Sequence, residues 1–160
     1  MLQIELSSGP RWSKERDWES LCLTAANAAI TASPYGNLLN QPFALEISFT
    51  LTGDDEVQKL NAQYRQKDKP TNVLSFPLVQ KDMLSGLANT DDGEILLGDI
   101  ILAHGVCSKE AEEKSVSLSD HMSHLVVHGT LHLLGYDHEQ ENEAIVMEEL
   151  ETQALATIGI

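Results

Sequence analysis

The feature that most constrains this chain is a histidine-rich stretch over residues 117–138, Ser-Leu-Ser-Asp-His-Met-Ser-His-Leu-Val-Val-His-Gly-Thr-Leu-His-Leu-Leu-Gly-Tyr-Asp-His. Four of its histidines follow one another at intervals of three, four and four residues: His121, His124, His128 and His132. On an α-helix these side chains share one stripe, with apolar residues on the opposite side. Ser117 with Asp120 is typical of a helix start, and Gly135 is typical of the left-handed residue that ends a helix. The stretch therefore predicts a largely buried helix with a polar stripe.

Three histidines of this stretch have the spacing of a metal site. His128 and His132 lie one helical turn apart, and the glycine turn can bring His138 back toward them. Three neutral imidazoles and a water form a catalytic zinc site, whereas a closed structural site needs four protein ligands, usually thiolates. A histidine pair alone would more often be a chance feature, and the third histidine favours a metal. We expect one Zn²⁺ ion on His128, His132 and His138, with His121 and His124 as bystanders or residues that support the ligands.

Length and composition restrict the class of protein. At 160 residues, one domain covering residues 1–160 is expected. We find no apolar run long enough to cross a membrane, and the first residues read as a strand rather than as a secretory leader. The two cysteines, Cys22 and Cys107, predict reduced thiols in the core of a cytoplasmic protein.

The charge distribution limits where the chain could bind a polyanion. The formal net charge is −15, and phosphates require local positive charge. Five of the ten basic residues gather in one neighbourhood: Lys59, Arg65, Lys67, Lys69 and Lys81. A short strand predicted within it, residues 72–76, is bracketed by Pro70 and Pro77, which suits the edge of a sheet. Its unpaired backbone could take an extended ligand, although a plain edge strand is an equally good interpretation.

Apolar periodicity predicts the remaining elements. Strands are expected at about 2–7, 43–51, 72–76 and 94–102, the last near-continuously apolar and therefore central. A helix capped by Ser13 is expected at about 13–31, and a short helix is expected to begin within 52–56. Further helices are expected at 104–114, over the histidine stretch and at 140–157, with a loop at 78–93. Asp99 within the central strand should be paired or hydrogen-bonded. The fold class is α+β: one small, mostly central sheet of about four strands with about five helices, one of them a zincin-like histidine-bearing helix.

The histidine motif resembles two known patterns. Its spacing is similar to that of the metzincin zinc proteases, but Gly129 stands where that pattern has its glutamate. The closer resemblance is to the YbeY family of ribosomal RNA maturation factors. It rests on four segments: Tyr-Arg at 64–65, Lys-Pro-Thr-Asn-Val-Leu-Ser-Phe at 69–76, Leu-Gly-Asp-Ile at 97–100, and His-Gly-Thr-Leu-His-Leu-Leu-Gly-Tyr-Asp-His at 128–138.

This resemblance implies a bacterial, cytoplasmic, zinc-dependent endoribonuclease specific for single-stranded RNA. Such proteins act late in small-subunit maturation, at the 3′ end of 16S ribosomal RNA, and in ribosome quality control. The family's zinc ligands fall on His128, His132 and His138, and its functionally important arginine falls on Arg65. Partners implied are ribosomal RNA and the small subunit or one of its proteins, with no membrane. Asn72 stands where many members have aspartate, so we give it no catalytic role.

The residues themselves leave several alternatives open. Arg65 suits a catalytic contact to phosphate, with Lys67 and Lys69 assisting as point charges. Either water or the 2′-hydroxyl of RNA could attack, and Asp99, Asp137 or Glu139 could supply a base. A metzincin-like peptidase and a non-catalytic assembly factor with structural zinc are the other classes, the latter marked by a fourth protein ligand. Where the peptidase has its glutamate, Gly129 also leaves space that phosphate and ribose could occupy.

Overall fold

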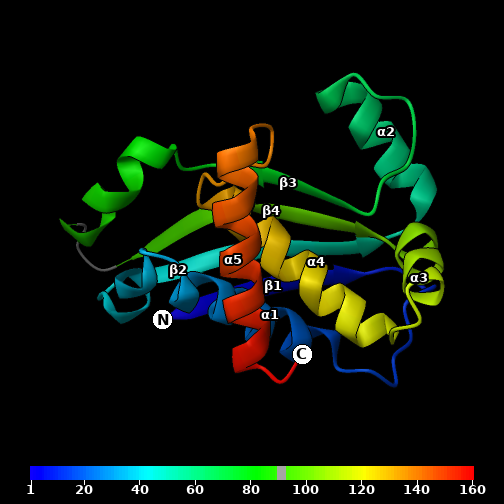
Figure 1. Cartoon of the computed structure of the whole chain (residues 1–160), viewed down its shortest axis with the longest axis horizontal. Helices are drawn as coiled ribbons and strands as arrows, with labels where there is room; N and C mark the ends of the chain where they lie inside the picture. Colours follow the sequence, from blue (N-terminus) through cyan, green and yellow to red (C-terminus); the bar gives the residue numbers. More distant parts are fainter. Residues whose placement is uncertain (90–92) are drawn as a thin grey trace.

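The computed structural model describes residues 1–89 and 93–160. Within this part, four strands and five α-helices occur as predicted, together with two 3-10 helices (Figure 1). In chain order they are β1 (Leu2–Ser8), α1 (Trp18–Ala32), η1 (Gly36–Asn40), β2 (Ala44–Thr52), α2 (Asp54–Arg65), β3 (Val73–Pro77), η2 (Lys81–Asn89), β4 (Glu94–Ala103), α3 (His104–Glu113), α4 (Leu118–Leu133) and α5 (Glu141–Thr157).

The four strands form one sheet in the order β1-β2-β4-β3. Strands β1, β2 and β4 run parallel, whereas β3 pairs antiparallel with β4 at the edge. The structure thus confirms the central place of β4 and the edge place of the short strand after the basic residues. At this edge, Arg65 at the end of α2 donates a hydrogen bond to the Ser75 carbonyl of β3.

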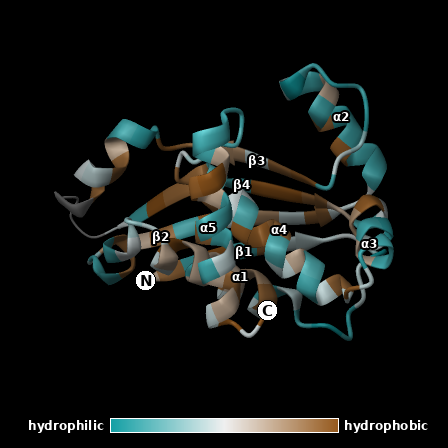
Figure 2. Ribbon diagram, viewed as in Figure 1, coloured by the Kyte–Doolittle hydropathy of each residue, from teal (hydrophilic) through white to brown (hydrophobic). Residues whose placement is uncertain are grey.

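Helices α1, α4 and α5 cover one face of the sheet and enclose the main core (Figures 1 and 2). Helix α4 approaches β4 very closely at Gly98. A Cβ atom built there would lie 2.5 Å from the carbonyl oxygen of Phe76 and 2.6 Å from a methyl carbon of Leu133. A side chain on residue 98 would therefore push the end of α4 away from the sheet. This glycine lets the sheet hold the part of α4 that carries the histidines.

The opposite face of the sheet is covered mainly at one end, where α2 packs on a small apolar cluster of Val57, Leu74, Ile101 and Ala103. Asp99 lies between Gly98 and Ile100, which both face α4, so its side chain points to this second face. There it is only partly buried. The expectation of a buried, paired carboxylate is wrong, because this face leaves Asp99 in contact with water.

Two predicted boundaries differ from the structure. Helix α1 begins at Trp18 rather than at 13, and its cap is Asp17, whose carboxylate accepts a hydrogen bond from the Ser20 amide at 3.0 Å. Ser13 instead accepts from the amide of Glu15 in a preceding turn. The predicted loop 78–93 contains η2, and its residues 90–92 lie outside the described part of the chain.

Both cysteines are unpaired and buried, as predicted. Burial raises the pKa of Cys22 and of Cys107 to about 12, so neither thiol is a nucleophile near neutral pH. Across the described residues, we find no helix with the length and apolar character needed to cross a membrane.

Candidate metal centre

The predicted limits of the histidine helix are confirmed. The hydroxyl of Ser117 caps α4 by accepting from the Asp120 amide at 3.0 Å. After the helix ends, Gly135 adopts a φ of +92°, the left-handed region that favours glycine. The turn that follows is tied back to the helix, because Nδ1 of His132 donates to the Tyr136 carbonyl at 2.8 Å. This turn determines the position of the His138 backbone.

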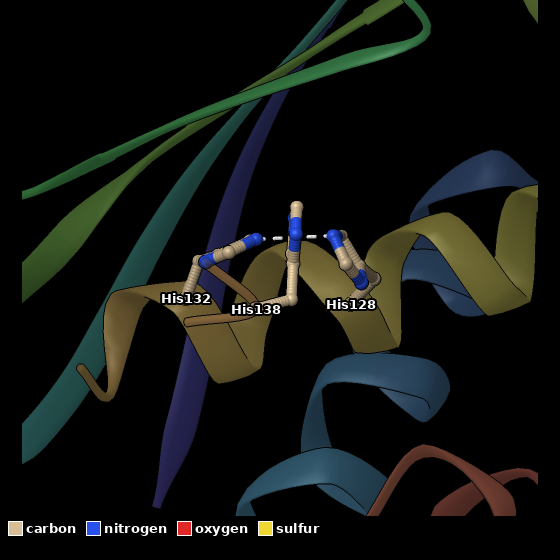
Figure 3. Close-up of side chains that lie close together, drawn as sticks. All are labelled: His128, His132 and His138. Carbon is tan, nitrogen blue, oxygen red and sulfur yellow. Dashed lines mark hydrogen bonds between the residues drawn. The ribbon is translucent and has the colours of Figure 1, made fainter. Parts of the chain in front are cut away.

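The three predicted metal-ligating histidines converge (Figure 3). One nitrogen of each of His128, His132 and His138 lies within 4.8 Å of the others. The ring centroids are 4.5 Å apart for His128 and His132, and 5.4 and 5.2 Å from these two to His138. Two of these histidines lie on α4, and the third lies in the turn after it. Over residues 1–89 and 93–160 the cluster holds three such side chains, so no fourth protein ligand closes it.

The hydrogen bonds around His128 and His132 determine which nitrogens carry protons. Nδ1 of His128 lies 2.5 Å from a carboxylate oxygen of Glu151, and Nδ1 of His132 lies 2.8 Å from the Tyr136 carbonyl oxygen. Both oxygens can only accept, so each Nδ1 must donate, and a neutral imidazole then presents a lone pair at Nε2. The two Nε2 atoms face each other at 3.0 Å.

Two facing lone pairs at this distance repel each other unless a cation lies between them. Zinc bound to two histidines at about 2.0–2.1 Å in tetrahedral geometry separates their nitrogens by roughly 3.3 Å, which is close to the distance here. The donor set therefore fits a metal ion held by neutral imidazoles, with a position left for a water or a substrate atom.

Charges at the site agree with these proton positions. Burial and the neighbouring His128 lower the pKa of His132 to about 4, so this imidazole is neutral at neutral pH. Burial alone would raise the pKa of Glu151, but hydrogen bonds from His124 and His128 outweigh it and lower this pKa to about 2. An ionised carboxylate thus lies against Nδ1 of His128, on the side of the ring away from the cluster.

The predicted bystanders are confirmed as hydrogen-bonded side chains outside the cluster. Nε2 of His121 lies 2.9 Å from Glu110, and Nε2 of His124 lies 3.1 Å from Glu151. Glu151 was not predicted from the sequence, because its charge alone does not distinguish it from the other acidic residues of the last helix. Its spacing from Met147 and Ala154, both buried, was the available signal, since it places residue 151 on the inward stripe of α5.

The structure brings the basic residues and the histidines to one cleft of about 860 Å³. Of the five basic residues, Arg65, Lys67 and Lys69 line it, together with residues of β3 and the three histidines. Arg65 is held in place by two contacts. Its guanidinium donates to the Ser75 carbonyl at 2.6 Å and lies over the ring of Phe76, 5.3 Å from the centroid. Its remaining N–H groups are available to a ligand.

The sequence suggested that Gly129 leaves space for a ligand. The structure shows that it does not. A Cβ atom at this position would lie 3.0 Å from the hydroxyl oxygen of Ser75 and 3.3 Å from a methyl carbon of Ile100. Residue 129 is buried against the sheet, so the glycine is explained by close packing of α4. A glutamate there would displace β3, which further disfavours a metzincin-like mechanism.

The three candidate bases differ in position. Asp99 faces away from α4 and is excluded as a general base by its place on the opposite face of the sheet. Asp137 and Glu139 both line the cleft beside His138. Asp137 also accepts from the backbone amide of His138 at 2.8 Å, and so helps to hold the turn.

The chain matches a family model described as Endoribonuclease YbeY over residues 11–159. The chain belongs to the YbeY family. It is 56% identical over 160 residues to a relative named Endoribonuclease YbeY from Rhizorhabdus wittichii, covering 100% of this chain and 95% of the relative. A relative of the same name from Sphingopyxis alaskensis is 50% identical, with the same coverage. The resemblance stated from the sequence is therefore confirmed.

A solved structure shares the fold of this YbeY-family chain. The solution structure of TM1509 from Thermotoga maritima superposes with a TM-score of 0.56 at 23% identity, covering 99% of this chain and 91% of that one. The predicted α+β class is thus supported both by the strands and helices of this chain and by a structural neighbour.

Proposed function

We propose that this chain is a zinc-dependent endoribonuclease that cuts single-stranded RNA. The observation that carries the proposal is the single cleft that joins a three-histidine metal site to Arg65, Lys67 and Lys69. An RNA backbone offers one phosphate per nucleotide, and a strand lying in this cleft places one phosphate between the arginine and the histidines. The names of the relatives, all endoribonucleases, support the same class of reaction.

Each group has a role in this proposal. A Zn²⁺ ion on His128, His132 and His138 would supply Lewis-acid chemistry and activation of a water. Arg65, already oriented by Ser75 and Phe76, would grip two phosphate oxygens with its planar fork. Lys67 and Lys69 would add positive charge along the strand. Asp137 and Glu139 are the carboxylates near enough to the cleft to accept a proton.

The substrate should be unpaired RNA because the site is recessed. A flexible strand can bend a phosphate into the cleft and splay its bases, whereas the phosphates of a duplex lie on a stiff cylinder. The positively charged surface is small and the chain carries a net charge of −15. We therefore expect weak, salt-sensitive RNA binding by the isolated chain, acting as one domain over residues 1–160.

Help from a larger assembly would compensate for this weak binding. We propose that the RNA is the 3′ end of 16S ribosomal RNA, cut late in small-subunit maturation and in ribosome quality control in the cytoplasm. The small subunit or one of its proteins would deliver the strand. The motif resemblance to the family supports this finer proposal.

A panel of substrates tests the reaction class. Zinc-loaded protein should cut an unstructured RNA slowly, resist duplex RNA of the same sequence, and leave casein intact. His132→Ala protein, purified identically, controls for contaminating ribonuclease and should be inactive. Cleavage of casein that a chelator abolishes, without cleavage of RNA, would replace this proposal with a peptidase.

A further inference from the structure

One carboxylate reaches the metal cluster from a different helix. Glu151 of α5 is largely buried against α4, and both of its oxygens are occupied. One oxygen lies 2.5 Å from Nδ1 of His128, and the other lies 3.1 Å from Nε2 of His124. Together these two contacts fix the orientation of the carboxylate.

We propose that Glu151 is a positioning residue for the metal, which holds Nδ1 of His128 in a hydrogen bond and so directs Nε2 of its ring toward the cluster. A neutral imidazole carries its proton on either nitrogen, and only the nitrogen without it can bind a metal. The carboxylate holds the proton on Nδ1, so the Nε2 lone pair points at His132 and His138. This inference rests on the metal site of the proposed function but not on the nature of its substrate.

Nδ1 of His132 has an equivalent hydrogen-bond acceptor in the backbone. It donates to the carbonyl of Tyr136, which no side-chain substitution removes. His128 depends on a side chain, and that side chain comes from α5. Docking of α5 on α4 therefore completes the proposed metal site, which explains why one acidic residue of α5 is buried beside Met147 and Ala154.

The chain contains a second carboxylate–histidine hydrogen bond, whose histidine lies outside the metal cluster. Glu110 of α3 lies 2.9 Å from Nε2 of His121, so it makes the same type of bond to a histidine of the same helix. His121 is buried and is no member of the metal cluster. Loss of Glu110 therefore removes a carboxylate–histidine bond without touching a ligand, which separates positioning from general stability.

Zinc affinity of substituted proteins tests the proposal. The dissociation constant is measured by competition with a chelating dye for the full-length parent, Glu151→Met, Glu151→Gln and Glu110→Met. We expect Glu151→Met to bind zinc about 10–100-fold more weakly, since this is the usual effect of losing such a partner. Glu151→Gln keeps an acceptor and should fall between parent and Met. Glu110→Met should stay within about threefold of the parent.

A spectroscopic signal gives a second readout. The Nδ1 proton of His128 should appear as a hydrogen-bonded imidazole resonance in the zinc-loaded parent, in Glu151→Gln and in Glu110→Met, and should disappear in Glu151→Met. The proposal is overturned if Glu151→Met binds zinc like the parent, or if Glu110→Met weakens binding equally. If Glu151→Met does not fold, parental affinity in Glu151→Gln overturns it. Neither readout uses RNA, so failure of the proposed substrate leaves this test intact.

Discussion

Alanine in place of His138 is expected to abolish tight zinc binding while leaving the fold in place. His138 is exposed and lies outside the helices, so its loss removes a ligand without opening the core. With two ligands left, affinity should fall by at least about 100-fold, more than the loss of a supporting hydrogen bond would cause. Metal content of the dialysed protein and a titration with zinc measure this directly.

The same substitution should lower thermal stability only when zinc is present. A metal at 100 times its dissociation constant stabilises a folded protein by about 2.7 kcal/mol, which for this size corresponds to roughly 5–10 °C. Parent and variant should therefore have the same melting temperature in the presence of chelator and different melting temperatures in the presence of zinc. His121→Ala is the control and should keep the ion, because His121 bonds to Glu110 outside the cluster. Full metal occupancy in His138→Ala would rule out the ligand set.

Glutamate in place of Arg65 should abolish RNA cleavage while the metal is retained, whereas the His138 substitution should lose both. Arg65 lines the same cleft as the histidines, its guanidinium is held by Ser75 and Phe76, and none of the salt bridges among the described residues involves it. Removing a donor that stabilises developing charge costs about 100–1,000-fold in rate. Arg65→Lys should also be slow, because an ammonium cannot make the two-pronged contact.

Lys59→Glu is the matched control for Arg65→Glu. Both substitutions lie on α2 and change the net charge equally, but Lys59 does not line the cleft. Initial rates on unstructured RNA at one salt concentration compare the two. Equal rates for Arg65→Glu and the parent would show that the basic residues are merely solvated and take no part in cleavage. Equal losses of rate in Arg65→Glu and Lys59→Glu would point to net charge rather than to Arg65.

The local signals in the sequence were sufficient to predict that three histidines converge. Helix spacing, the Ser117 cap and the Gly135 turn are short-range features, and they place His128, His132 and His138 together without knowledge of the rest of the fold. Patterns of apolar residues likewise predicted the four strands; in β2, for example, buried and partly buried residues alternate as the apolar and polar residues do. The convergence of Arg65 with the histidines needed the family resemblance, because α2 and α4 lie far apart in the chain.

Contacts between distant helices explain what the sequence did not show. The spacing of Glu151 from Met147 and Ala154 indicates an inward position on α5, but only the packing of α5 on α4 shows that it bonds to His128. Gly129 looked like open space, but its environment is set by Ser75 and Ile100 from other strands. Asp99 looked buried because β4 is apolar, yet one face of the sheet is incompletely covered.

The central claim, that RNA is cut at this metal site, is tested most directly by restoring zinc to chelator-treated protein and measuring cleavage of an unstructured RNA. We expect no cleavage in chelator, a rise in proportion to added zinc, and a plateau at one ion per chain, with no recovery in His138→Ala at the same zinc concentrations. Cleavage that survives removal of the metal, or that recovers equally in His138→Ala, would contradict the claim.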